Sequence, residues 1–172
     1  MLLLLNMKKK IAIAIVIVVA LLLIVGVLVY VMTIPVVNLG DVAFETVQRD
    51  FHGGVEVPKN VAITDEAAWT TLWNQMSANI TPKPPAPEID FANELIVGVF
   101  MGTKSTGGYS TEVTRIAKTD AKITVYIREV SPGPNCAVTL ALTVPYHIVK
   151  MQKVDGDIDF SVTKDVTECP AP

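Results

Sequence analysis

Residues that carry out chemistry are scarce in this chain of 172 residues, which contains only two histidines and two cysteines. Neither histidine stands at metal-ligand spacing beside a cysteine, so a zinc site is disfavoured. The sequence has no G-x-S-x-G motif, and no nucleophile stands beside His52 or His147. We therefore predict that the protein is not an enzyme and uses neither a metal nor another cofactor.

Basic residues are also too few for a protein that binds nucleic acid. Three of the fourteen Lys and Arg residues are Lys8, Lys9 and Lys10, so the rest of the chain has eleven basic and seventeen acidic residues, a net charge of −6. Aromatic residues make up 6% of the sequence. Because phosphate binding needs a basic face and stacking needs aromatic side chains, nucleic acid is excluded as a partner.

No charged residue interrupts residues 11–32, a run rich in Ile, Val and Leu. A helix of this length reaches roughly 33 Å, which is enough for a hydrocarbon layer of roughly 30 Å, so the run predicts one transmembrane helix. The lysines before it favour the cytoplasmic side. A cleaved signal peptide is the alternative. However, a typical signal peptide has a shorter apolar region followed by a small-x-small cleavage site, and this run is longer and leads into no such site. We expect an uncleaved anchor, with residues 1–10 in the cytoplasm.

Beyond this run, we expect a juxtamembrane segment at residues 33–41 and one extracytoplasmic domain at residues 42–172. Both cysteines, Cys136 and Cys169, lie in that domain. An even pair in an oxidising compartment predicts a disulfide, and two unpaired thiols are the alternative. Asn79 begins an N-x-T pattern, which is a glycosylation acceptor if the source cell modifies asparagine.

One helix is expected early in the domain. Thr64 is suited to be its N-cap, and Asp65 and Glu66 suit the positive end of the helix dipole. Its apolar residues recur at helical spacing and form one stripe that should pack on a sheet. They are Trp69, Leu72, Trp73 and Met76. Four prolines within residues 81–87 then mark a boundary in the chain.

Strand patterns dominate the rest of the domain. A weak strand is predicted at residues 42–51, and Asp155 and Gly156 form the sharpest hairpin signal. The other predicted strands are residues 95–101, 109–116, 123–130, 138–144, 146–153 and 158–163. Several short strands after one helix predict an α+β fold, with a mainly antiparallel sheet and one packed amphipathic helix.

Two short segments resemble ligand sites. Residues 102–109 have the glycine spacing of a phosphate loop, but Gly108 and Tyr109 replace its lysine and hydroxyl residue, so a tight turn with positive φ at Gly107 or Gly108 is expected. Asp155, Asp157 and Asp159 alternate like calcium ligands, but the later positions of a calcium loop are missing. The acids then lie on the solvated face of a hairpin. A small-molecule or calcium-binding sensor is therefore the alternative function.

The second half of the chain resembles a known family. An apolar strand ends at Gly102 and is followed by T-G-G-Y at residues 106–109, P-G-P at residues 132–134 and V-P-Y at residues 144–146. This order is similar to the C-terminal domain of the PrcB-like family, the protease complex subunits. The resemblance covers about residues 94–153.

The resemblance implies an extracytoplasmic accessory protein that binds another protein, with a surface protease as the expected partner. No catalytic residue is assigned to this domain, and a transmembrane helix here replaces the lipid anchor of the namesake. The candidate interaction or structural residues are Gly102, Lys104, Thr106, Gly107, Gly108, Tyr109, Pro145 and Tyr146. We therefore expect a single-pass membrane protein whose outer domain assists or stabilises a protease.

Overall fold

The computed structural model describes residues 21, 23, 40–119 and 122–170. The chain divides into two compact units, Met1–Val37 and Asn38–Pro172, and the fold below is that of the second. Apart from Leu21 and Leu23, the predicted transmembrane run lies outside the described residues. Among the helices that are described, none is long and apolar enough to cross a membrane.

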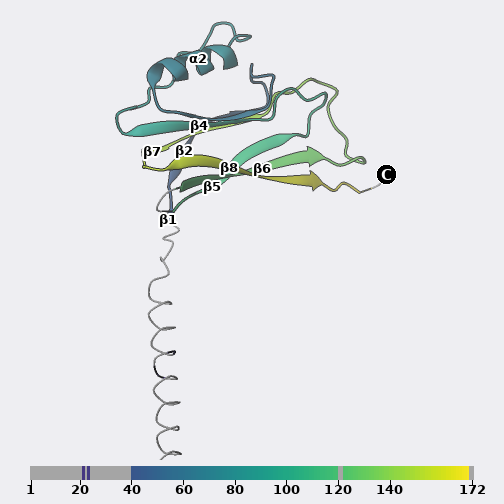
Figure 1. Ribbon diagram of the computed structural model, residues 1–172. Helices are drawn as coiled ribbons and strands as arrows, with labels where there is room; N and C mark the ends of the chain where they lie inside the picture. Colours follow the sequence, from purple (N-terminus) through teal and green to yellow (C-terminus); the bar gives the residue numbers. More distant parts are fainter. Residues whose placement is uncertain (1–20, 22, 24–39, 120–121, 171–172) are drawn as a thin grey trace, which may run out of the picture. The chain divides into compact units, whose positions relative to one another are not determined.

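In residues 40–119 and 122–170, eight strands form two four-stranded sheets, which Figure 1 shows one above the other. Sheet A has the order β1 (Gly40–Asp41), β5 (Ser110–Lys118), β6 (Lys122–Pro132), β8 (Asp157–Thr167). Sheet B has the order β2 (Phe44–Asp50), β7 (Tyr146–Gln152), β4 (Glu94–Phe100), β3 (Lys59–Ile63). Neighbouring strands are antiparallel except β6 and β8, which pair in parallel. The expected mainly antiparallel α+β fold is confirmed.

Helix α2 (Glu66–Met76) begins one residue later than the sequence predicted. Thr64 is not the N-cap, because the side chain of Asp65 accepts the amide hydrogen of Ala68 at 2.9 Å. A carboxylate there also interacts favourably with the helix dipole. The predicted apolar stripe is confirmed, since all four of its residues are buried.

Two apolar cores lie on opposite faces of sheet B. On one face, the stripe of α2 packs on Ile96, Phe100 and Ile148. On the other face, Val97 and Val149 pack with the inward residues of sheet A. The layers are therefore helix, sheet B and sheet A, as Figure 1 shows. Burial on both faces explains why β4 and β7 read as almost continuous apolar runs.

The proline-rich segment lies along α2 and satisfies its tryptophans. The indole N–H of Trp69 donates to the carbonyl of Pro87, and that of Trp73 donates to the carbonyl of Pro84, both at 3.0 Å. The two rings contact each other, with centroids 5.4 Å apart. This stretch therefore packs against the helix as an extended cover within one compact unit.

Two predictions about strands are wrong. Residues 138–144 form no strand, because their only sheet-like pairings are isolated bridges from Thr143 to Lys104 and from Val144 to His52. The turn at Asp155 and Gly156 closes no hairpin, since it carries the chain from β7 in sheet B to β8 in sheet A. Strand β3, which has five residues and pairs with β4, is not predicted from the sequence.

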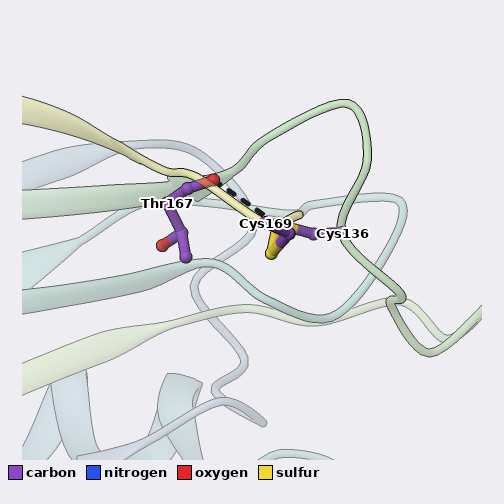
Figure 2. Close-up of a disulfide and its surroundings, with 3 residues drawn as sticks. All are labelled: Cys136, Thr167 and Cys169. Atoms are coloured by element: carbon purple, nitrogen blue, oxygen red, sulfur yellow. Dashed lines mark hydrogen bonds between the residues drawn. A yellow bond between two sulfur atoms is a disulfide. The ribbon is translucent and has the colours of Figure 1, made fainter. Parts of the chain in front are cut away.

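The predicted disulfide between Cys136 and Cys169 is confirmed, with Cα atoms 5.1 Å apart. It joins the connection between β6 and β7 to the segment after β8. The carbonyl of Thr167 accepts the amide hydrogen of Gly133 at 3.0 Å. The same carbonyl oxygen lies 3.4 Å from Cys136 Sγ (Figure 2). These contacts anchor the beginning of the long β6–β7 connection to the end of β8.

Candidate functional site

A pocket of about 410 Å³ opens where the β4–β5 loop meets the β6–β7 connection. The segment just after β2 completes its wall. The lining residues are Phe51, His52, Gly107, Gly108, Tyr109, Ser110, Thr139, Ala141 and Thr143. Three of the predicted candidate residues, the glycines and the tyrosine of T-G-G-Y, therefore lie in one pocket.

The glycines of the T-G-G-Y loop allow the two connections to approach closely. Gly108 has a φ of 87°, which favours glycine, so the expected positive φ falls on this residue. Gly107 has no such φ, but a Cβ atom there would lie 2.3 Å from Thr139 Oγ1. Its amide hydrogen is donated to the carbonyl of Thr139 at 3.0 Å. Side chains at either position would push the two walls of the pocket apart.

Thr143 joins the other end of the β6–β7 connection to the same loop. Its hydroxyl donates to the carbonyl of Thr106 at 2.8 Å, and its backbone forms two hydrogen bonds with the backbone of Lys104. The Lys104 ammonium lies 5.6 Å from the centroid of the Tyr109 ring. The candidate residues Lys104 and Thr106 thus support the wall of the pocket without lining it.

Exposed apolar side chains lie on two of the segments that form the wall of the pocket. Leu140 and Leu142 are 93% and 70% exposed, while their neighbours Thr139, Ala141 and Thr143 line the cavity. Phe51 is an exposed large apolar residue that also lines the pocket. We call the pocket together with Phe51, Leu140 and Leu142 the pocket face. Large apolar side chains this exposed on neighbouring segments mark a candidate interaction site.

The strands that build this face lie in a segment that matches a known family model. Residues 95–152 match the model of the PrcB C-terminal family. The resemblance predicted from the sequence is thus confirmed, within one residue of the expected boundary at each end. The PrcB C-terminal segment begins in β4 and ends in β7, and it includes both connections that line the pocket. Comparison with curated proteins and with solved structures gave no significant match.

Gly102, Pro145 and Tyr146 also belong to the PrcB C-terminal segment, but they do not line the pocket. Gly102 has a φ of 68° and packs on Pro58, where a Cβ atom would lie 2.6 Å from that ring. The carbonyl of Pro145 accepts the amide hydrogen of Met101. Tyr146 stacks on Phe100 in the core beneath α2. Their positions indicate structural roles.

Burial raises the pKa of Tyr146 to about 12, and the nearby carboxylate of Asp50 adds to the effect. The phenol therefore stays neutral at physiological pH. Tyr146 also packs against Gly53, where a Cβ atom would lie 2.7 Å from its ring. The tyrosine thus holds the segment between β2 and β3 against β7.

His52 is the one histidine that reaches the pocket. Its Nδ1 lies 3.3 Å from a carboxylate oxygen of Asp50, and its side chain is 77% exposed. Ser110 and Thr139 share the cavity, but within the part of the chain that the structure describes no hydrogen bond joins their hydroxyls to this imidazole.

His147 lies on β7 between the two sheets and is buried. Its Nδ1 accepts the amide hydrogen of Val113 at 2.9 Å, so the ring proton must be on Nε2, which lies 2.9 Å from the Thr46 hydroxyl. Burial lowers the pKa of His147, the positive charge of Arg49 lowers it further, and Glu112 opposes them. This histidine is neutral and joins β7 to β5 and β2.

The acids of the calcium hypothesis lie at the start of β8. Asp157 and Asp159 are exposed, and Asp159 forms an ion pair with Lys122 on β6. A hydrogen bond to Asp159 and its charge raise the pKa of Lys122. In residues 40–119 and 122–170, no group of three His, Cys, Asp or Glu side chains is placed to hold a metal ion.

Phe51, Leu140 and Leu142 are not among the candidate site residues predicted from the sequence. The alternation of apolar residues around Leu140 predicts a strand instead. One sequence feature does indicate that Leu140 and Leu142 lie in a connection: their segment follows the P-G-P turn and the first cysteine. A disulfide-anchored connection is a common place for exposed binding residues, because loops on a rigid scaffold carry function.

Proposed function

We propose that the protein is a membrane-anchored accessory module that binds a cell-surface protease through its pocket face. The match of residues 95–152 to the PrcB C-terminal family supports a role in a protease complex. The exposed leucines beside the pocket carry the proposal, because they form an apolar surface on a well-supported scaffold. The pocket suits one apolar side chain of the partner, with Leu140 and Leu142 packing around it.

The disulfide supports a location outside the cytoplasm, since such bonds persist in oxidising compartments. The apolar run at residues 11–32 would anchor the domain within a few residues of the bilayer. Anchoring on the same surface would raise the effective concentration of this domain for a protease displayed there.

The proposed topology predicts that protease added to intact cells removes the domain. Proteinase K should degrade residues beyond the membrane in whole cells, while a cytoplasmic protein of the same cells stays intact. An epitope tag placed before Lys8 should remain protected until the membrane is opened. Protection of the domain in intact cells would contradict the outward location.

A photoreactive amino acid at Leu142 is expected to cross-link to a protease in intact source cells, because the proposed interface surrounds this residue. Leu140→Asp in the same reporter chain should lower the cross-linking yield about tenfold, since a buried charge replaces an apolar contact at the centre of the interface. The measurement is the yield of the cross-linked product on immunoblots, with the partner identified by mass spectrometry.

Ile80 provides the matched control, because it is an exposed apolar residue that does not line this pocket. Ile80→Asp should leave the yield unchanged. Circular dichroism should show the same melting temperature for both variants, because both side chains are exposed. An equal loss of yield in the two variants, or cross-linking to proteins other than proteases, would contradict the proposal.

A further inference from the structure

Strand β8 is an unusually open sheet edge. It runs for eleven residues, it contains no glycine or proline, and its register with β6 is continuous from Asp157 to Thr167. Within the described residues, no strand pairs with its other side. Its free edge therefore offers a long row of backbone donors and acceptors, which is a template for another strand.

The other three edge strands, β1, β2 and β3, have features that prevent pairing with a further strand. Strand β1 has two residues, and β3 has five and directly follows Pro58. The pairing of β2 shifts register between Thr46 and Gln48, which is the mark of a bulge. Short edges, bulges and prolines are the means by which proteins prevent edge-to-edge pairing. Strand β8 has none of these three features, and its only charge outside the aspartates is the exposed Lys164 near its C-terminal end.

The charges of β8 face back across sheet A. Asp165 accepts a hydrogen bond from Arg128 at 2.6 Å, and Asp159 is paired with Lys122, with both partners on β6. Side chains on alternate residues share a face, so Asp157 lies in the same row. These carboxylates form an acidic row on the outer face of the sheet, and pairing with β6 keeps Asp159 and Asp165 from blocking the edge.

The opposite row of β8 is apolar except for the exposed Lys164, and it is partly uncovered. Ile158 and Phe160 pack against the core between the sheets. Val162 and Val166 lie in the same row but are 39% and 63% exposed. The apolar face of sheet A therefore extends beyond the part that sheet B covers. A further strand beside β8 would bury Val162 and continue the core.

We propose that β8 binds an extended segment of another protein in which apolar and basic residues alternate. Backbone hydrogen bonds to the free edge would supply affinity, as in β-augmentation. The apolar residues would cover Val162 and Phe160, and the basic residues would face Asp157, Asp159 and Asp165. A second copy of β8 fits less well, because each copy carries three aspartates and one lysine. This surface is separate from the pocket face and does not depend on the proposed function.

The test uses the full chain in detergent micelles and a fluorescein-labelled peptide of four Lys-Val repeats. The peptide should bind saturably in fluorescence anisotropy and should slow hydrogen exchange of the β8 amides at least tenfold. Val162→Lys should weaken binding about tenfold, which corresponds to about 1.4 kcal/mol, because an inward-pointing charge blocks the edge. Val57→Lys is the matched control at another exposed valine and should bind like the unmodified chain.

Two further peptides separate edge pairing from simple charge attraction. Glu-Val repeats should bind at least tenfold more weakly, and Lys-Val repeats with N-methylated alternate amides should bind equally weakly because they lack edge donors. Tight binding of the N-methylated peptide, or no slowing of exchange in β8, would overturn the proposal. Protection of β8 that rises with protein concentration in the absence of peptide would identify a second copy as the occupant and would also overturn it.

Discussion

Replacing Cys136 and Cys169 with serine is expected to lower the free energy of unfolding by about 3 to 4 kcal/mol. The disulfide closes a ring with a sequence separation of 33 residues, and the chain-entropy model gives this magnitude for such a ring. Removing the bond lets the unfolded chain sample many more conformations. Urea denaturation of the variant and of the unmodified chain measures the difference, and reduced unmodified protein should match the variant.

The same variant should loosen one wall of the pocket. The bond anchors the segment that leads to Thr139, and β8 otherwise contacts it through the hydrogen bond between Gly133 and Thr167. Hydrogen exchange of residues 137–143 should therefore accelerate more than that of β4, which lies in both cores. A stability loss below about 1 kcal/mol would show that the ring constrains the unfolded chain much less than the entropy model requires.

Replacing His147 with leucine is expected to lower the free energy of unfolding by about 1 to 3 kcal/mol at neutral pH. Leucine is apolar and of similar size, but it leaves the buried amide hydrogen of Val113 without its acceptor, and this magnitude is typical of such a loss. The Thr46 hydroxyl is closer to solvent and can bind water instead. Chemical denaturation at pH 7.5 measures the effect.

The variant should also lose a pH dependence that the unmodified chain shows. Burial lowers the pKa of folded His147, so the unfolded chain binds the proton more readily. The contribution of His147 to the free energy of unfolding is therefore complete above about pH 6.5, the ordinary pKa of histidine. It is lost as the pH falls toward the lower pKa of the folded state. The charged groups that act on the His147 ring are Arg49 and Glu112, which form an ion pair with each other at 3.0 Å.

His52→Leu provides the control for this prediction, because His52 is exposed and outside the cores. The stability of the His52→Leu variant should fall between about pH 6.5 and 5 as steeply as that of the unmodified chain. If the stability of His147→Leu changes with pH as steeply as that of the unmodified chain over this range, the assignment of His147 as a neutral ring with two hydrogen bonds is wrong.

The elements with local signals were predicted well. Helix α2 was recognisable because Trp69, Leu72, Trp73 and Met76 repeat at helical spacing, and this period depends only on neighbouring residues. Five of the six strands expected after the proline-rich segment exist for the same reason. The missed N-cap differs by one residue, since Thr64 and Asp65 are both good caps and the structure selects the carboxylate.

The errors concern pairings between distant residues. Asp155 and Gly156 have the residues of a hairpin turn, but β8 pairs with β6 because its apolar row is buried between the sheets. Residues 138–144 alternate like a strand, yet the disulfide and the hydrogen bonds of Thr143 hold them along the T-G-G-Y loop. A local pattern shows that a residue is suited to a strand, and only packing decides its partner.

The sequence by itself determined the scarcity of catalytic residues, the single cysteine pair and the similarity of residues 95–152 to the PrcB C-terminal family. With two cysteines in the whole chain, one disulfide is the only intramolecular pairing available. Tertiary structure alone decided that Leu140 and Leu142 are exposed beside a pocket, that His147 is a neutral link between sheets, and that β8 forms an open edge. These features arise from contacts between residues far apart in the chain, which depend on how the two sheets pack.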